Sequence, residues 1–314
     1  MNSAKRRRRR RNRVIKAVIA WAICVFLIGI IAVGTFQLAA YLTTSKKRQY
    51  RAEGIEKLEA GDYAGAIGAF DAALEKSGKR AAEFNRDVIL YRADAEFLLK
   101  DYNAALHSYD LLLEMEPDTP EYMYRQSSCY GQLGDTDNAV KRYQEAAAAD
   151  KPDKPALGRE EALLAAGGAC MDAKEYDRAA ELYENALQEG MEHGEIYNQM
   201  GLCKMAEEDY QGAFDSFDKG YQIEAARNDG GDSGSGTDGG SGSGGDSGSG
   251  TDGGSSSGGD GGASQQLKEL AYNRAVACEH LQQYDKALSL FQDFVKTFGS
   301  NEDAEHEIAF LKTR

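Results

Sequence analysis

The chain has 314 residues and a formal net charge of −14, and its charges are unevenly distributed. Residues 1–51 contain 13 Lys and Arg and no acid, whereas residues 52–314 contain 24 Lys and Arg against 51 Asp and Glu. Non-specific nucleic-acid binding requires basic residues that neutralise phosphate, so the acidic body excludes it. Four His and five scattered Cys also exclude a zinc ribbon or a disulfide framework, and we expect no cofactor.

A basic run precedes a long apolar stretch near the N-terminus. The basic run contains Lys5, Arg6 to Arg11 and Arg13. The 24 residues from Ala17 to Ala40 carry no charge. As a helix they would extend about 36 Å, enough for a hydrocarbon core of about 30 Å. The apolar region of a signal peptide is shorter, about 7–15 residues. The pattern predicts a basic cytoplasmic tail over 1–13 and a retained transmembrane helix over 14–42. A signal cleaved after 38–40 is the alternative.

The charges on either side of this stretch predict its orientation. Eight Lys and Arg precede it, and Lys46, Lys47, Arg48 and Arg51 follow it. Because the more basic flank stays in the cytoplasm, we expect a single-pass protein with residues 45–314 outside the cytoplasm. The short basic tail suits a bacterial cell membrane.

Six windows of fifteen residues align without gaps in the rest of the chain. Their seventh position is always alanine: Ala66, Ala105, Ala139, Ala179, Ala213 and Ala287. Their eleventh position is always aromatic: Phe70, Tyr109, Tyr143, Tyr183, Phe217 and Phe291. The windows begin at residues 60, 99, 133, 173, 207 and 281, so the base period is 34 residues, with two short insertions and one long one. Alanine lets two helices approach closely, and we expect each aromatic to fill the space between its helix pair and the next.

This pattern resembles the tetratricopeptide repeat (TPR) family, whose unit is a 34-residue helix–turn–helix. The resemblance extends from about Tyr50 onward and includes the turn Gly61–Asp62–Tyr63 and the closing proline at Pro117. The position that the family keeps small is occupied by Gly54, Ala93, Ser127, Gly167, Gly201 and Ala275. The family's early tryptophan is absent. The resemblance implies an all-α TPR solenoid of about six repeats behind the transmembrane helix.

The expected domains follow from the register of the windows. Repeats one to five occupy residues 47–227, and the sixth repeat with a capping helix from Asn301 to Lys312 occupies residues 265–314. Residues 228–264 are almost entirely Gly, Ser, Asp and Thr and cannot bury a core, so we expect a disordered loop. A calcium-binding β-roll is disfavoured because it needs a large apolar residue in each nonapeptide, and none is present.

No arrangement of residues predicts catalysis or metal binding. Four cysteines fall at small apolar positions of first helices, where core thiols are expected: Cys129, Cys170, Cys203 and Cys278. A disulfide between Cys170 and Cys203 is the alternative. The four His stand apart from any metal-ligand spacing. We therefore expect a protein that is not an enzyme.

Binding is the role that the resemblance implies, in a concave groove lined by the first helices. We take the second, fifth, ninth and twelfth positions of each first helix as groove-facing. Read from the sequence, the candidates are Leu90, Asp94, Phe97, Tyr124, Ser128, Leu164, Met171, Asn198, Leu202, Met205, Tyr272 and Val276. Some family members hold a peptide carboxylate with Lys and Asn at the fifth and ninth positions. Here those positions are Arg51 and Ile55, Leu90 and Asp94, and Tyr124 and Ser128, so the clamp is missing.

These patterns together predict a membrane-anchored TPR scaffold that binds a protein or peptide outside the cytoplasm, at the cell envelope. One alternative is a cytoplasm-facing membrane receptor or adaptor. Another is an accessory subunit of an envelope enzyme complex, whose activity would appear only with its partner. The sequence predicts no oligomeric state.

Overall fold

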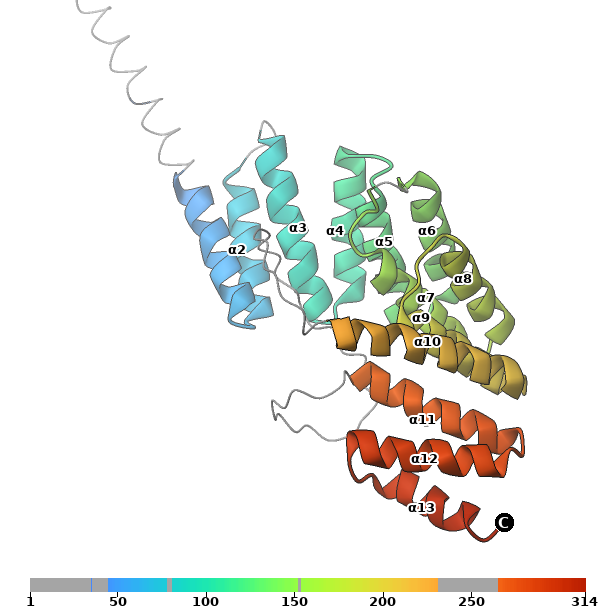
Figure 1. Cartoon of the computed structure of the whole chain (residues 1–314). Helices are drawn as coiled ribbons and strands as arrows, with labels where there is room; N and C mark the ends of the chain where they lie inside the picture. The colour runs from blue at the N-terminus through green and yellow to red at the C-terminus, as the bar shows by residue number, and fades with distance from the viewer. Residues whose placement is uncertain (1–34, 36–44, 78–80, 152–153, 231–264) are drawn as a thin grey trace, which may run out of the picture. The chain divides into compact units, whose positions relative to one another are not determined.

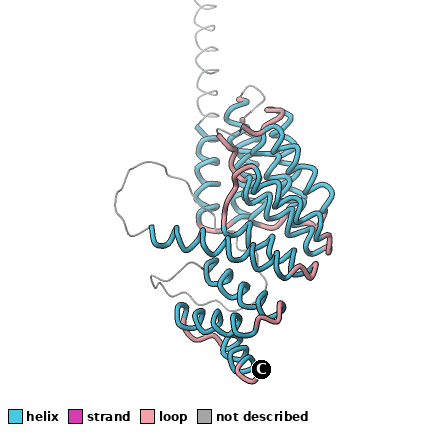
Figure 2. Tube along the Cα trace, turned by 45° about the vertical axis from the view of Figure 1, so that its right-hand side comes forward, coloured by secondary structure: helices cyan, strands magenta, loops and turns pink. Residues whose placement is uncertain are grey.

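The computed structural model describes residues 35, 45–77, 81–151, 154–230 and 265–314, and these residues are helical with no strand among them (Figure 1; Figure 2). The chain divides into two compact units, Met1–Tyr122 and Met123–Arg314. Among the described residues, no helix has both the length and the apolar character needed to cross a membrane. The transmembrane helix predicted over 14–42 lies outside them, apart from Thr35.

The described helices form the pairs that the windows predict. Unit 1 contains a helix over residues 45–59, α2 (Tyr63–Glu75), α3 (Ala82–Leu98), α4 (Tyr102–Met115) and the start of α5 (Pro120–Gln132). Unit 2 continues with α6 (Thr136–Ala149), α7 (Arg159–Asp172), α8 (Tyr176–Gln188), α9 (Gly194–Ala206) and α10 (Tyr210–Gly230). Its last helices are α11 (Gln265–His280), α12 (Tyr284–Phe298) and α13 (Glu302–Leu311). The prediction of an all-α helical-repeat fold is confirmed for the residues that the structure describes. Helix α13 lies within the range 301–312, where the sequence predicts a capping helix.

The second helix of every repeat begins at the fourth position of its window. An Asp at the third position caps four of them. Its carboxylate accepts the N–H three residues later, in the pairs Asp62–Gly65, Asp101–Ala104, Asp135–Asn138 and Asp209–Gly212, at 3.0–3.2 Å. These bonds satisfy N–H groups that have no partner within the helix. Glu175 and Gln283, at the same position, make no such bond.

The turn between the paired helices has one geometry in all six repeats. The residue at the second window position has a left-handed backbone, with φ of 78° at Gly61 and 71° at Gly134. Four repeats hold a residue with a side chain there, with φ of 60–64°: Lys100, Lys174, Glu208 and Gln282. The next residue donates its N–H to a carbonyl five residues back, as Asp135 does to Tyr130 at 3.0 Å. This is the Schellman ending, which favours glycine.

In three repeats the aromatic of the second helix packs on a glycine of the first helix of the same repeat. A Cβ added to Gly54 or Gly201 would lie 2.4 Å from the ring of Phe70 or Phe217, respectively. A Cβ added to Gly167 would lie 2.2 Å from Tyr183 Oη. The aromatics therefore do more than fill the space between successive pairs, because they also set how closely the two helices of one repeat approach.

The two short insertions form the loops between α2 and α3 and between α6 and α7. In the second loop, Asp150 accepts N–H groups from Lys151 (2.8 Å) and Ala156 (3.0 Å), so its carboxylate organises the loop. The predicted disordered segment 228–264 lies outside the described residues except for 228–230. Those three residues belong to α10, which ends at Gly230, so the helix continues beyond the change in composition.

Replacing Gly167 by alanine should destabilise the protein by about 1–3 kcal/mol, because the new methyl group would overlap the buried ring of Tyr183. The neighbouring Gly168 is the matched control, since a Cβ there meets nothing within 4 Å. Gly168→Ala should stabilise the helix by about 0.5–1 kcal/mol. Urea unfolding followed by circular dichroism measures both, and equal effects of the two substitutions would contradict this packing.

Replacing Lys174 or Glu208 by glycine should raise the free energy of unfolding by about 0.5–1 kcal/mol, because glycine adopts the left-handed conformation without steric cost. Lys141→Gly, within α6, should lower the same quantity by about 1 kcal/mol. Denaturant midpoints of the three variants provide the measurement. Destabilisation by all three would show that this turn conformation is not the one in solution.

Candidate functional site

The candidate groove residues of unit 1 lie on α3 and are partly exposed. Asp94 accepts a hydrogen bond from Tyr109 Oη at 3.2 Å. The ring of Phe97 packs edge-on against Tyr102, with centroids 5.3 Å apart. Two of the three candidates on α3 are thus already engaged in contacts between the helices of their own repeat.

Three of the candidates in unit 2 are buried. Tyr124, on α5, is fully buried and donates its hydroxyl to Asp150 at 3.1 Å. Ser128 donates to the carbonyl of Tyr124 at 3.2 Å, and Asn198 accepts from Asn273 Nδ2 at 2.9 Å. Tyr124 and Ser128 make these bonds within the third repeat, whereas Asn198 joins α9 to α11. The burial of all three argues against direct contact with a ligand.

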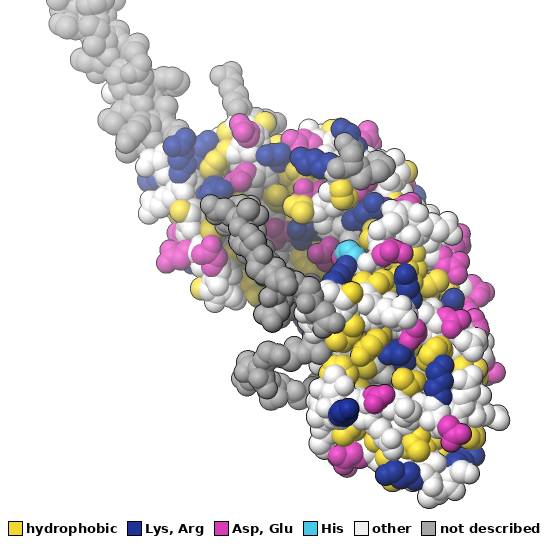
Figure 3. All heavy atoms as spheres, viewed as in Figure 1, with side chains coloured by type: hydrophobic (Ala, Val, Ile, Leu, Met, Phe, Trp, Pro, Cys, Tyr) yellow, Lys and Arg dark blue, Asp and Glu magenta, His cyan; other side chains and the backbone are white. Residues whose placement is uncertain are grey.

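The other six candidates of unit 2 are partly exposed apolar residues, which we call the apolar row. They are Leu164 and Met171 on α7, Leu202 and Met205 on α9, and Tyr272 and Val276 on α11. Helix α9 contacts both α7 and α11, and Cys203 Sγ lies 3.1 Å from Met171 Sδ. The row therefore comes from three neighbouring first helices. On the face of the protein drawn in Figure 3, apolar side chains of unit 2 form patches interrupted by charged ones.

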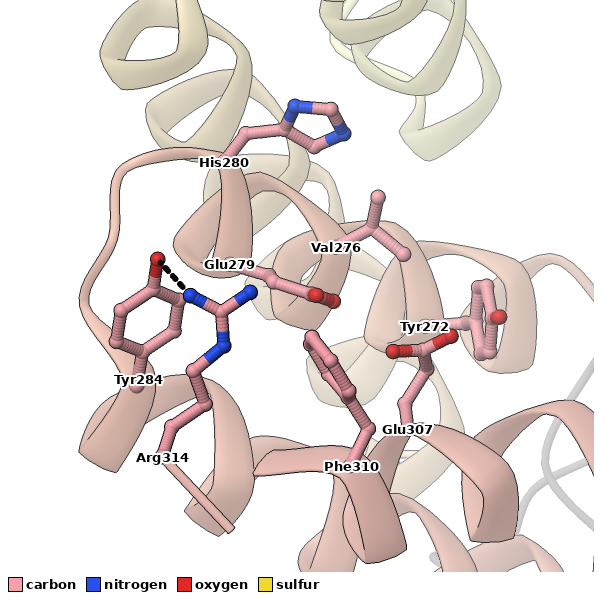
Figure 4. A pocket seen from close by; sticks show the side chains of 8 residues that line it. All are labelled: Tyr272, Val276, Glu279, His280, Tyr284, Glu307, Phe310 and Arg314. Atoms are coloured by element: carbon pink, nitrogen blue, oxygen red, sulfur yellow. Dashed lines mark hydrogen bonds between the residues drawn. The ribbon is translucent and has the colours of Figure 1, made fainter. Parts of the chain in front are cut away.

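A pocket of about 420 Å³ lies at the α11 end of the apolar row (Figure 4). Tyr272 and Val276 belong to both the row and the pocket. The remaining lining residues are Glu279 and His280 of α11, Tyr284 of α12, Glu307 and Phe310 of α13, and Arg314. The capping helix thus closes the last repeat and also supplies one wall of the pocket.

The aromatic walls of the pocket are held by packing. The ring of Tyr272 meets Phe291 and Phe294 edge-on, with centroids 5.5 and 5.6 Å away. The guanidinium of Arg314 lies over the rings of Tyr284 and Phe310, 5.1 and 4.8 Å from their centroids, and donates to Tyr284 Oη at 3.4 Å. This side of the pocket is already occupied by a cation of the chain itself.

The electrostatics of the pocket are dominated by carboxylates. Burial raises the pKa of Glu279, and the charge and hydrogen bonding of Glu307 raise it further. The pKa of Tyr272 is also raised, first by burial and then by the charges of Asp303, Glu307 and Glu279. The two glutamates come from different helices, and both carboxylates point into the pocket (Figure 4).

The four cysteines of the described chain are buried free thiols, so Cys170 and Cys203 are not joined. Burial raises the pKa of Cys203 to about 12, which keeps this thiol protonated and unreactive. The described residues contain no group of three or more His, Cys, Asp or Glu side chains arranged to hold a metal ion.

Sequence reasoning missed the acidic half of the pocket. Glu279 occupies the twelfth position of its first helix, which is groove-facing, yet it is absent from the candidates read from the sequence. Glu307, Phe310 and Arg314 follow the last window. The packing stripe of α13 contains the buried residues Ala304 and Leu311. Glu307 and Phe310, three residues apart, lie on a second face of the same helix, and this spacing could have revealed that face.

Comparison with known proteins finds a similarity over the first repeats. A tetratricopeptide repeat family model matches residues 51–120, 90–155 and 124–193. Residues 51–193 are therefore similar to tetratricopeptide repeats. The helix pairs α9–α10 and α11–α12 continue the same register of alanine, aromatic and turn residues beyond the matched segment.

A small glutamine-rich TPR-containing protein 2 of Mycosarcoma maydis is 28% identical over 89 residues, which are 28% of this chain and 24% of that protein. This chain thus spans about a quarter of that relative's length. The apo form of RapI is similar in fold, with a TM-score of 0.58, 16% identity and coverage of 86% of this chain and 68% of that one. A MamA structure from Desulfovibrio magneticus RS-1 has a TM-score of 0.47, 17% identity and coverage of 58% and 97%.

Replacing Glu307 by glutamine should lower the pKa of Glu279, because it removes both the charge and the carboxylate hydrogen bond that raise it. Because the pKa of Glu279 is higher in the folded state than in the unfolded state, the protein loses stability as the pH rises between these two pKa values. The variant should therefore lose less stability over that pH interval. Carboxyl carbon NMR titration measures the pKa. Asp303→Asn, one turn earlier in α13, is the control. An unchanged pKa in Glu307→Gln would contradict the pairing.

Proposed function

We propose that this protein is a TPR scaffold that binds a segment of a partner protein along the apolar row of unit 2. The supporting observation is the row itself. Leu164, Leu202, Met205 and Val276 remain partly exposed on neighbouring first helices, although the cores of their repeats are fully buried. Covering such side chains gains about 25 cal/mol for each Å² of apolar surface removed from water, so a partner segment would be stabilised there.

We further propose that residues 14–42 anchor the protein in a membrane with the repeats outside the cytoplasm. The support is the 24-residue uncharged stretch and the heavier basic charge before it. Scaffolding at the cell envelope follows from this topology. The alternative of a cytoplasm-facing receptor retains the same binding surface and differs only in orientation.

The topology can be tested with a single cysteine at Ser257, with the native thiols replaced. A thiol reagent that cannot cross membranes should label this cysteine in intact cells, because the proposed topology exposes residues 228–264 outside the cytoplasm. A cysteine at Asn2, in the basic tail, is the control and should react only after lysis. The reverse pattern would favour the cytoplasm-facing receptor.

Binding along the apolar row can be tested by photocrosslinking. A benzoylphenylalanine at Met205 should crosslink to a discrete partner, whereas the same group at the exposed Glu184 of α8 should not. With the partner identified by mass spectrometry and purified, Met205→Asp should weaken its binding about tenfold or more, because a carboxylate would be desolvated in the contact. Equal crosslinking at both positions, or unchanged affinity, would contradict the proposal.

A further inference from the structure

The pocket between α11 and α13 contains more acidic than basic charge. Glu279 and Glu307 are its carboxylates, Arg314 is its one lining guanidinium, and Asp303 lies close enough to raise the pKa of Tyr272. His280, also at the rim, stacks on Tyr210 with centroids 4.7 Å apart. An additional cation would therefore be attracted, whereas an anion would be repelled and an uncharged group would desolvate the carboxylates without compensation.

Arg314 demonstrates the chemistry that the walls accept. Its planar guanidinium is held by two aromatic rings and one hydroxyl, a combination that suits arginine better than the compact ammonium of lysine. Arg314 lies on the Tyr284 side of the pocket, whereas Tyr272 and Glu307 lie on the opposite side (Figure 4). The acidic side therefore has room for a second guanidinium.

The pocket is continuous with the apolar row. Tyr272 and Val276 line both, and α11 is joined to α9 by the Asn198–Asn273 bond and by Gln266 donating to Glu195 at 3.1 Å. A segment lying along the row would pass the mouth of the pocket and could place one side chain inside it. A volume of about 420 Å³ is sufficient for the end of a long side chain.

We propose that this pocket binds an arginine side chain of the partner segment, with its guanidinium held by the carboxylates of Glu279 and Glu307 beside Tyr272. The inference rests on the proposed function, since the arginine belongs to the segment that covers the apolar row. It specifies the partner as apolar with one arginine at the end that meets α11. A bound metal ion is disfavoured, because no group of three ligating side chains lies among the described residues.

The test uses the full chain in detergent micelles and a library of random peptides. Peptides selected on the protein should carry an arginine near one end of an apolar stretch. In the tightest binder, that arginine is then replaced by citrulline, a neutral side chain of nearly the same shape. The exchange should weaken binding about tenfold, because it removes charge-assisted hydrogen bonds to the two carboxylates.

The matched variants assign this effect to the pocket. In the Glu279→Gln/Glu307→Gln variant, the arginine and citrulline peptides should bind within about twofold of each other. The Glu181→Gln/Glu184→Gln variant makes the same charge change on exposed positions of α8 and should retain the tenfold difference. Arg314→Ala removes a like charge and should tighten the arginine peptide about twofold to fivefold. Circular dichroism confirms that each variant is folded.

The outcomes separate the two proposals. Apolar peptides selected without a preference for arginine, or a tenfold citrulline effect that persists in the Glu279→Gln/Glu307→Gln variant, would overturn the arginine pocket and leave the apolar row as the binding surface. A preference for lysine equal to that for arginine would also overturn the guanidinium assignment. Failure to select any peptide would contradict both proposals.

Discussion

The close packing of an aromatic side chain on a glycine sets the distance between the two helices in three of the repeats. The two residues are sixteen apart in sequence, as in Gly54 and Phe70, Gly167 and Tyr183, and Gly201 and Phe217. Burying such a ring contributes about 2–3 kcal/mol, and the ring fits only because the first helix has no side chain beneath it. Serine serves at the same position in the third repeat, where Ser127 donates its hydroxyl to the carbonyl of Ala139 at 2.8 Å. This hydrogen bond joins α5 to α6, the two helices of that repeat.

The first helices also carry apolar residues at the edge of the core. One face of each first helix carries the small residue and the core, so its sequence is constrained. Leu202, Met205 and Val276 pack against core residues and remain partly exposed. The turns between paired helices also depend on packing, because Lys174 and Glu208 adopt a left-handed backbone conformation that favours glycine. The geometry of the helix pair is therefore imposed by packing, even where the local sequence opposes it.

Much of the fold of the described residues could be predicted, because the repeat shows its packing rule six times. The windows share one register, and each second helix begins at the fourth position of its window. The family resemblance identifies the small position of each first helix. Prediction was weaker for the surface, where each residue depends on neighbours outside its own repeat. The buried Tyr124 donates its hydroxyl to Asp150, at the start of an insertion loop. The buried Asn198 accepts a hydrogen bond from Asn273, which follows the long insertion in sequence. The pocket was missed because α13 belongs to no window and supplies Glu307 and Phe310 from a face that the packing stripe does not include.

A partner segment that covers the apolar row of unit 2 would change the environment of the methionine methyl groups there. The chain has seven methionines. Met171 and Met205 lie in the apolar row, Met123 and Met200 are buried, and Met115 is exposed in unit 1. In a methyl NMR titration of the full chain with the purified crosslinked partner, the signals of Met171 and Met205 should shift together and saturate at one equivalent. Shifts at Met115 with Met171 and Met205 unchanged would place the partner elsewhere and contradict this account.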